Sequence, residues 1–261
     1  MKVAIIGLGF VGNALNNGIS DSVDIFKVDP KLNTSILDLQ QFSPEIIFIC
    51  APTPMDKEGN QDISIVNSIL DEINEYSIKS TVVLKSTTLP NNITKMLQRN
   101  KRLIINPEFL READAMEDFI NSDLIIFGGE IAECKKVSEF YINHTKCIQK
   151  DHIFTDAISA SLIKYAINSF LATKVIFFNQ LKELFNESNA NDSWDNFIKY
   201  IAFDKRIGNS HMQVPGPDNR FGFGGACFPK DTKALNEYMK TLGTPNQVLE
   251  SVIKQCELIR K

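Results

Sequence analysis

Short hydrophobic, β-branched runs recur along the first half of the chain, with segments of helical character between them. The runs read KVAIIG, VDIFKV, EIIFIC, TVVLKS, RLIIN and DLIIFGG. Apolar runs of this length that alternate with helices are typical of parallel strands buried on both faces. The pattern predicts an α/β class fold, with a Rossmann-like, doubly wound parallel sheet over residues 1–150.

The second half of the chain has a different pattern. Residues 130–207 contain neither glycine nor proline, which predicts a mainly helical region. A long apolar stretch follows Asp156, a plausible N-cap, and continues to residue 187. Its apolar residues cover most of the helix circumference, so we expect burial on several sides at a domain or subunit interface. A helical central domain over residues 151–261 is therefore predicted.

Three shorter helices are expected after the long one. The segments DSWDNFIKYIAF and DTKALNEYMKTLG each have helical character. Thr244 and Pro245 then predict the N-cap and first turn of a final helix.

Composition and charge narrow the class of protein. The 261 residues carry a net charge of −4 without a basic run, which argues against a nucleic-acid partner. No apolar run approaches the roughly 20 residues that cross a bilayer, and no signal-peptide cleavage site is evident. The five cysteines are scattered without a CxxC pair, which favours free thiols and no metal site. We expect a cytoplasmic protein with no membrane partner.

A glycine motif lies between the first predicted strand and helix. GLGFVG places Gly7, Gly9 and Gly12 in the G-x-G-x-x-G spacing, which lets a pyrophosphate approach a helix N-terminus. Asp29 ends the second strand, where a carboxylate can bind a ribose 2′-hydroxyl and repel a 2′-phosphate. The motif predicts NAD rather than NADP as the cofactor. A structural turn beside an unrelated aspartate is the alternative.

A second glycine-rich segment surrounds a cysteine. In FGFGGACFPKDTKAL, Cys227 precedes an expected helix start, and both that N-terminus and Lys230 would lower a thiol pKa. Glycines at 222, 224 and 225 would leave room for a substrate in front of the thiol. Taken alone, a loop cysteine is more often an inert small residue than a nucleophile.

Polar residues occur at two further places where chemistry is possible. Lys164 and Asn168 are four residues apart on the long helix, as an anion-stabilising pair or as a snorkelling lysine beside an amide. NPEFLREADAMED places Glu108 and Glu112 one helical turn apart at the carboxyl edge of the sheet, where such folds bind ligands.

KSTTLP ends another strand with three hydroxyl side chains. These are Ser86, Thr87 and Thr88. Hydroxyls at a strand end can face a ligand, or they can merely cap the following helix. The segment by itself leaves both interpretations open.

Together these motifs resemble the UDP-glucose/GDP-mannose dehydrogenase family, and the UDP-glucose 6-dehydrogenases in particular. The similar segments are GLGFVG, APTP, KSTTLP, NPEFLREA, KYAINSFLATK, RIG and GFGGACFPKD, in the family's order. The resemblance implies NAD-dependent oxidation of the C6 hydroxyl of a nucleotide sugar to a carboxylate. UDP-glucose and UDP-glucuronate would be the substrate and product, in the biosynthesis of polysaccharide precursors.

The resemblance also implies roles for individual residues. Cys227 would attack the C6 aldehyde, and the thiohemiacetal would lose a second hydride to become a thioester. Lys164 and Asn168 would stabilise the oxyanion, and Asp231 would order water or accept a proton. Glu108 would act in acid/base hydrolysis of the thioester.

Further implied residues bind the cofactor and the sugar. Thr87 would hold the hydrolytic water, and Arg206 of the RIG segment would reach the substrate of a neighbouring subunit. The implied cofactor-binding residues are Gly7, Gly9, Phe10, Val11, Gly12, Asp29, Thr53, Thr87 and Glu112. The implied substrate-binding residues are Glu108, Phe109, Leu110, Lys164, Asn168, Arg206, Arg220, Phe221 and Gly224.

The sequence departs from the family pattern in two respects. HMQVPGPDNRFGFGG is longer than the usual link, so Asn219 and Arg220 are expected to extend the sugar loop. Family members continue through a third domain that holds the nucleotide, whereas this sequence ends at Lys261. We expect a short form that forms a homodimer through its long helix, with Arg206 and Arg220 reaching a phosphate.

Two other functions are compatible with parts of the sequence. The β-hydroxyacid dehydrogenases share the N-terminal domain, the long helix and the spacing of Lys164 and Asn168, but they transfer one hydride and need no cysteine. GFGGACFPKD and NPEFLREA discriminate against them. A non-catalytic, NAD-binding partner of a full-length enzyme is the second alternative, and the intact set of polar residues argues against it.

Overall fold

The computed structural model describes residues 1–56 and 59–260. The chain divides into two compact units. The first contains Met1–Asp56 and Gln61–Lys164, and the second contains most of the chain from Tyr165 onward. This division falls later than residue 150, because the first turns of the long helix pack into the core of the sheet unit through Ala157 and Ala160.

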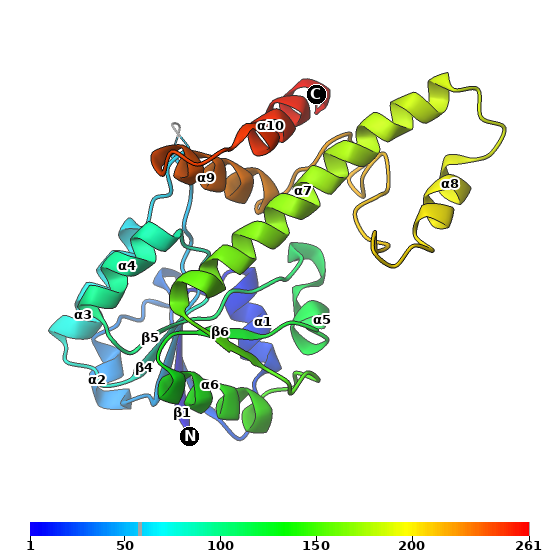
Figure 1. The fold of residues 1–261 in the computed structure, drawn as a ribbon. Coiled ribbons are helices and arrows are strands. Elements are labelled where there is room, and N and C mark those ends of the chain that lie inside the picture. The colour runs from blue at the N-terminus through cyan, green and yellow to red at the C-terminus, as the bar shows by residue number, and fades with distance from the viewer. Residues whose placement is uncertain (57–58, 261) are drawn as a thin grey trace. The chain divides into compact units, whose positions relative to one another are not determined.

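A sheet of seven strands forms the centre of the first unit, within the residues described (Figure 1). The strand order is β2-β1-β3-β4-β5-β6-β7. The strands are β1 (Lys2–Ile6), β2 (Asp24–Val28), β3 (Ile46–Ile49), β4 (Thr81–Leu84), β5 (Leu103–Ile105), β6 (Ile126–Gly128) and β7 (Ile153–Thr155). The first six coincide with the six predicted runs, and β1 to β5 are parallel.

The far edge of the sheet differs from the all-parallel prediction. β6 is antiparallel to β5, with which it pairs only through Ile105 and Gly128, and β7 runs parallel to β6. β7 was not expected from the sequence. It is a three-residue edge strand whose Ile153 and Phe154 are exposed, so it carries no buried run to reveal it.

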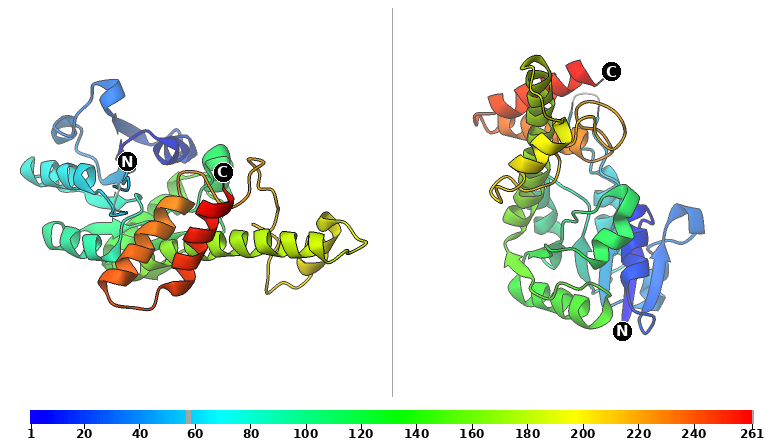
Figure 2. Two further views of the ribbon diagram at one scale, coloured as in Figure 1. Left: turned by 90° about the horizontal axis from the view of Figure 1, so that it is seen from above. Right: turned by 90° about the vertical axis from the view of Figure 1, so that its right-hand side faces the viewer.

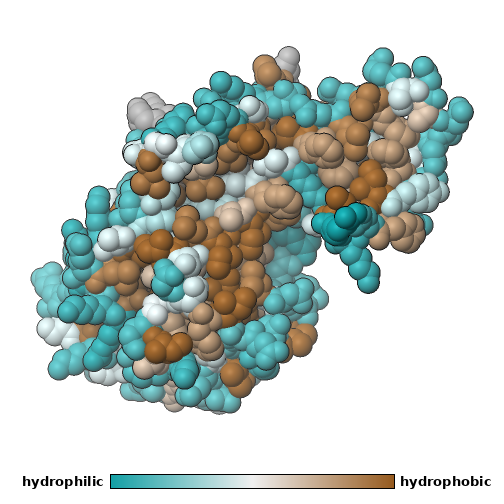
Figure 3. All heavy atoms as spheres, viewed as in Figure 1, coloured by the Kyte–Doolittle hydropathy of each residue, from teal (hydrophilic) through white to brown (hydrophobic). Residues whose placement is uncertain are grey.

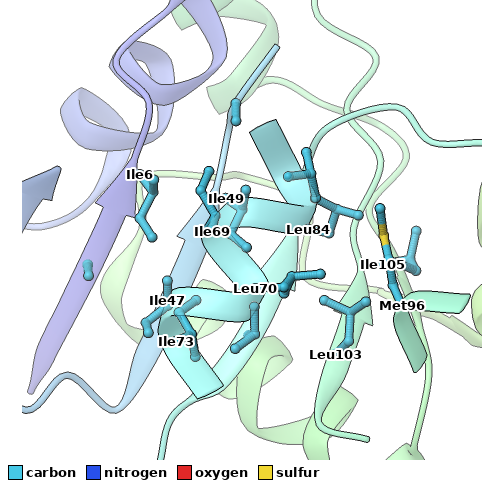
Figure 4. Close-up of a cluster of buried hydrophobic side chains, with 14 of the residues drawn as sticks. Ile6, Ile47, Ile49, Ile69, Leu70, Ile73, Leu84, Met96, Leu103 and Ile105 are labelled. Carbon is cyan, nitrogen blue, oxygen red and sulfur yellow. The ribbon is translucent and has the colours of Figure 1, made fainter. Parts of the chain in front are cut away.

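Helices cover both faces of this sheet. Val3 and Ile5 of β1 point to one face and Ala4 and Ile6 to the other, so each strand contributes to two cores. Figure 4 shows the core beneath α3 (Ser64–Glu75) and α4 (Pro90–Arg99). The helix α2 (Asp38–Phe42) covers the same face, and α1 (Phe10–Gly18), α5 (Ala115–Ile120) and α6 (Ile131–His144) cover the other. The doubly wound prediction is confirmed.

The strand order creates a binding position at the carboxyl edge. β1 lies between β2 and β3. The chain passes from β1 to β2 on one side, and the later strands, beginning with β3, are added on the other side of β1. Open α/β sheets bind ligands at such a switch point. The glycine motif follows β1 at this position, directly against the end of β3.

The second unit is helical. Its elements are α7 (Ala157–Glu187), which begins in the first unit, and α8 (Trp194–Ile201), α9 (Phe228–Thr241) and α10 (Gln247–Ile259). Asp156 accepts the Ser159 N–H at 2.9 Å, which confirms it as the cap of the long helix. Figure 2 shows α9 and α10 side by side.

The final helix starts later than predicted. Gly243 has φ +66° and donates to the Lys240 carbonyl, while the Thr244 N–H donates to the Met239 carbonyl. This pair of bonds is a Schellman motif that ends α9. Thr244 therefore closes the preceding helix instead of capping the next, and Asn246 occupies the N-cap of α10.

Among the residues that the structure describes, one helix is long and apolar enough to cross a membrane by length and composition alone. It is α7, whose most apolar 18-residue window is 50% buried inside the structure. The expectation that no stretch is long and apolar enough is therefore wrong, because α7 stays apolar on average despite its interspersed polar residues. Core helices of soluble proteins meet the same length and composition criteria.

Candidate active site

The first glycine motif forms a tight turn with an open centre. Gly7 has φ +90°, and a Cβ there would lie 2.9 Å from the Cys50 carbonyl oxygen. A Cβ on Gly12 would lie 2.0 Å from the Gly7 carbonyl oxygen, whereas one on Gly9 would meet nothing within 4 Å. No side chain caps α1, so its first N–H groups are available to an anion. This cradle fits a dinucleotide pyrophosphate.

Asp29 braces this turn from the end of β2. Its carboxylate accepts the Leu8 N–H at 2.8 Å and the Lys31 N–H at 2.9 Å. These hydrogen bonds, that from Leu8 foremost, lower the pKa of the carboxyl. The side chain is buried next to the glycine motif, at the end of the strand where the sequence placed it.

Thr53 and Thr87 meet at the next strand ends. The Thr53 hydroxyl donates to the Thr87 carbonyl at 2.8 Å. The Gln61 amide donates to the same carbonyl at 2.7 Å and accepts the Leu89 N–H at 2.9 Å. Gln61 thus ties together the segment that carries Thr87. The sequence held no signal for it, because its partners lie more than one element away.

The other hydroxyls of KSTTLP bond to backbone. Ser86 donates to the Ala51 carbonyl at 2.6 Å, and Thr88 donates to the Ser86 carbonyl at 3.1 Å. Neither caps α4, whose N-cap is Leu89. The Ser86 hydroxyl therefore joins the ends of β4 and β3, whereas the Thr88 hydroxyl bonds within its own segment. Neither bond matches the two interpretations considered.

The Lys164 side chain is buried, so it does not snorkel to the surface. Its side chain is 3% exposed, and Nζ donates to the Glu108 main-chain carbonyl. Nζ also lies 3.6 Å from Glu108 Oε1 and 5.2 Å from the centre of the Phe109 ring. Glu108 Oε2 accepts the Leu110 N–H at 2.7 Å. Lys164, Glu108 and Phe109 thus form one cluster in the first unit, with Leu110 buried beside it.

Glu112 does not join this cluster. The residues from Asn106 to Arg111 are not helical, so Glu108 and Glu112 are not one helical turn apart as predicted. Pro107 disfavours helix at this point, and the Arg111 N–H is bound by Asp118 at 2.8 Å. Glu112 begins an exposed 3₁₀ turn, Glu112–Asp114.

A second buried lysine supports the same strand ends and was missed by sequence reasoning. Lys85 Nζ donates to Asn106 Oδ1 at 2.8 Å and to the Tyr141 hydroxyl at 3.2 Å. Tyr141 also donates to Asn106 Oδ1, at 2.9 Å. Burial lowers the pKa of Lys85. Because Asn106 directly precedes the Pro107–Glu108 segment, this network fixes where that segment leaves β5.

In the second unit, Asn168 and Asp231 form a buried pair. Asn168 Nδ2 donates to Asp231 Oδ2 at 2.6 Å, and Lys230 Nζ lies 2.5 Å from Asp231 Oδ1. Asp231 is fully buried. Its N–H donates to the Cys227 carbonyl at 2.8 Å, and Cys227 is the half-buried N-cap of α9. The thiol therefore lies at a helix start, one turn before the carboxylate.

The predicted substrate arginines lie on exposed loops. Arg206 is paired with Asp204 at 2.5 Å, and its side chain is 88% exposed. The buried Lys174 donates to the Ile207 carbonyl at 3.0 Å and also to that of Gly208, which anchors the RIG segment to α7. Arg220 is exposed, as is Phe221 at 47%.

The glycines before Cys227 serve packing more than substrate access. A Cβ on Gly224 would lie 2.0 Å from Arg260 Nη2, and one on Gly222 would lie 3.0 Å from Cys256 Sγ. Of these three glycines, only Gly225 could carry a Cβ with no other atom within 4 Å. The prediction that all three leave space in front of the thiol is wrong, because α10 fills the space beside two of them.

Two family models match this chain. The NAD-binding domain of the UDP-glucose/GDP-mannose dehydrogenase family matches residues 31–144, and the central domain of the same family matches residues 158–257. The chain belongs to this family. Among the family's dehydrogenases, the UDP-glucose 6-dehydrogenase of Rickettsia bellii is 36% identical over 228 residues, which are 85% of this chain and 51% of that protein. TuaD, the UDP-glucose 6-dehydrogenase of Bacillus subtilis, is 29% identical over 98% of this chain and 63% of its own length.

Solved structures share the fold. A UDP-glucose dehydrogenase from Pyrobaculum islandicum superposes with a TM-score of 0.78 at 23% identity, over 98% of this chain and 68% of that one. A 3-hydroxyisobutyrate dehydrogenase from Mycobacterium tuberculosis reaches 0.72 at 15% identity, over 97% and 91%. The chain spans about half the length of the curated Rickettsia relatives it matches.

Proposed function

We propose that the chain oxidises the C6 hydroxyl of a nucleotide sugar, UDP-glucose in the first instance, to a carboxylate with NAD. The observation that carries this proposal is the buried Asn168–Asp231 pair one helical turn after Cys227. A thiol at a helix N-terminus, followed one turn later by a buried carboxylate that Asn168 and Lys230 hold in place, supports covalent chemistry at Cys227. A single-hydride dehydrogenase would need no such cysteine.

The first unit supplies the cofactor site of this proposal. Gly7, Gly9 and Gly12, with Phe10 and Val11 between them, would receive the pyrophosphate at the start of α1. When bound, NAD accepts a hydride from the substrate carbon in each of two oxidations.

Asp29 and Thr53 would face the rest of the dinucleotide. The ionised Asp29 carboxylate would accept a hydrogen bond from a ribose hydroxyl and would repel the 2′-phosphate of NADP. Thr53 and Thr87, joined by their hydrogen bond, would line the nicotinamide end. Glu112, whose side chain is exposed, would also contact the cofactor.

Cys227 would provide covalent catalysis. Its thiolate would add to the C6 aldehyde formed in the first oxidation, and the resulting thiohemiacetal would lose its hydride to become a thioester. Lys164 and Asn168 would donate to the oxygen on which negative charge develops. Asp231 would take up the proton that the C6 hydroxyl releases in the first oxidation. The covalent bond keeps the aldehyde on the enzyme between the two oxidations.

Hydrolysis would then release the product. Glu108 would remove a proton from a water held by the Thr87 hydroxyl, and the Cys227 thiolate would leave. Glu108 is suited to this work, because Lys164 and the Leu110 N–H hold its carboxylate in place. Phe109 and Leu110 would pack against the sugar.

The second unit would bind the nucleotide and a second copy of the chain. Arg206, Arg220, Phe221 and Gly224 would line the sugar-nucleotide side. Hydrophobic surface, brown in Figure 3, follows α7. On this helix the side chains of Phe170, Phe177 and Leu184 are 57–66% exposed. Such a stripe fits a two-fold homodimer through α7, in which Arg206 reaches the neighbouring substrate.

We assign this enzyme to the cytoplasm and to polysaccharide-precursor synthesis.

Counting the NADH formed per sugar tests this function. Purified protein is mixed with NAD and limiting amounts of UDP-glucose, other UDP-sugars and GDP-mannose. Two NADH per sugar consumed, with a uronate product, is the expected result. One NADH per molecule would favour a single-hydride dehydrogenase, and NAD binding without turnover of any sugar would favour a non-catalytic subunit.

A further inference from the structure

A hydrogen bond joins the loop that precedes Cys227 to α7. The loop begins with a turn in which the Gly216 N–H donates to the Arg220 carbonyl at 2.8 Å. Farther along, the Gly222 N–H donates to Asn179 Oδ1 at 3.0 Å. Asn179 is oriented by its own bond to the Val175 carbonyl, at 2.8 Å. This contact fixes one peptide of the loop from the side of the long helix.

Arg260, at the end of α10, fastens the same loop from the other side. Its Nη1 donates to the carbonyls of Phe221 and Gly222, at 3.3 and 3.4 Å. Its Nη2 forms an ion pair with Asp218, at the start of the loop. The Arg260 side chain is 20% exposed, so most of it is packed against the loop. One guanidinium therefore joins two points of the loop.

The glycine at 224 is explained by this arginine. A Cβ at Gly224 would lie 2.0 Å from Nη2 and 2.3 Å from Cζ of Arg260. The guanidinium thus occupies the space where any other residue at 224 would have its Cβ. Phe223 is held beneath it in an apolar cluster with Val252 and Cys256, and Cys256 Sγ donates to the Phe223 carbonyl at 3.3 Å.

Gly225 and Ala226 connect this fastened segment to Cys227. Gly225 has φ +77°, and its Cβ position has no neighbour within 4 Å. Ala226 is exposed, and Cys227 then begins α9. Because a two-residue link has a short reach, a displacement of residues 218–224 would pull on the first turn of α9, which carries the thiol.

We propose that Arg260 is a positioning residue, and that its contacts with Asp218, Phe221, Gly222 and Gly224 form a clasp that sets the conformation of the loop before Cys227. The planar fork of an arginine can bind a carboxylate and two carbonyls at once, which a lysine cannot. The role in turnover rests on the proposed function, whereas the holding of the loop does not.

Proteolysis measures the clasp without reference to turnover. Arg220 is exposed and lies inside the loop, so trypsin cleavage between Arg220 and Phe221 reports how often the loop opens. We expect Arg260→Met to accelerate this cleavage several-fold and to accelerate alkylation of the half-buried Cys227 by iodoacetamide. Arg260→Lys and Asp218→Asn should give intermediate rates. Cleavage after the exposed Arg206, outside the clasp, is the internal reference.

A matched variant on the same helix controls for general loss of stability. Lys254 of α10 pairs with Glu250 at 3.7 Å on the exposed side, so Lys254→Met removes a charge without touching the loop. It should leave both rates unchanged. Arg260→Met should also lower kcat by about tenfold to a hundredfold while the Kd for NAD stays the same, because a displaced nucleophile loses reactive geometry.

The possible results separate the clasp from the proposed function. Wild-type rates of cleavage at Arg220 and of alkylation at Cys227 in Arg260→Met would overturn the clasp. Faster cleavage with an unchanged kcat would overturn its role in positioning the thiol. If the wild-type protein oxidises no nucleotide sugar, the proposed function fails, and the cleavage and alkylation rates still decide whether Arg260 holds the loop.

Discussion

The two glycine-rich loops of this protein look alike in sequence and differ in structure. Each precedes a helix, α1 in the first unit and α9 in the second. In the first loop, Gly9 faces open space and the glycines let backbone approach backbone. In the second loop, the space beside Gly222 and Gly224 is occupied by the side chains of Cys256 and Arg260, in and directly after α10. The same residue type therefore makes room for a ligand in one loop and for a helix of the protein itself in the other.

The loops also differ in what their helix start presents. α1 begins with uncapped N–H groups and no reactive side chain, which suits the binding of an anion. α9 begins with a thiol, followed one turn later by a fully buried carboxylate. One loop is built to bind and the other, in our proposal, to react. The following experiments test this distinction, in order of decreasing expected effect.

The largest effect is expected from removing the thiol. Cys227→Ala should lower NADH formation from UDP-glucose at least about a thousandfold, because no covalent intermediate can form. NAD binding, measured by calorimetry, should be unchanged. Cys134→Ala, in the core of the first unit, is the matched control and should retain turnover. Retained activity in Cys227→Ala would remove the chemical difference between the loops.

Adding one methyl group to each loop tests their different uses of glycine. Gly9→Ala should leave the melting temperature unchanged, since φ is −70° and the Cβ position is empty, yet weaken NAD binding about tenfold or more. Gly224→Ala should leave NAD binding unchanged but cost about 1 kcal/mol of unfolding free energy, because Arg260 must move. If Gly9→Ala lowered stability without affecting NAD binding, and Gly224→Ala weakened NAD binding without affecting stability, the roles that we give to the two loops would be reversed.

A buried lysine supports the segment after β5 in the first unit, whereas a partly exposed guanidinium holds the loop of the second unit. Lys85→Met should cost about 1–3 kcal/mol, because Asn106 and Tyr141 lose a buried donor. Burial lowers the pKa of Lys85 in the folded protein, so its penalty is present at lower pH and is relieved as pH rises toward the unfolded value near 10.4. The stability gap to Lys85→Met, measured by urea unfolding, should therefore widen with pH.

The smallest effect concerns the charge that braces the first loop. Asp29→Asn should narrow the preference for NAD over NADP, measured by fluorescence titration. The folded pKa of Asp29 is lowered, so its carboxylate stabilises the fold above the unfolded value of about 3.9 and loses this contribution as pH falls through the folded pKa. The wild-type advantage in stability over Asp29→Asn should thus shrink below about pH 4. If the difference in stability between wild type and Asp29→Asn did not change with pH, the ionised Asp29 carboxylate would not be what stabilises the loop.

Sequence patterns of short range identified much of the architecture. Strands β1 to β6, the glycine turn after β1, the cap at Asp156 and the start of a helix at Cys227 each depend on a few consecutive residues. Apolar runs, glycine spacing and caps record these local requirements directly. The same patterns placed the family's motifs in order, and the matching family models bear out that resemblance.

The tertiary structure alone decided which residues hold these pieces in position. Lys85 finds Tyr141 across 56 positions of the chain, and Arg260 finds Asp218 across 42. The direction of β6, the pairing of β7 and the separation of Glu108 from Glu112 likewise depend on neighbours from other elements. A glycine's sequence context does not tell whether its empty side is filled by a ligand or by a distant helix. Only packing distinguishes the two, because the atoms that fill the space come from elsewhere in the chain.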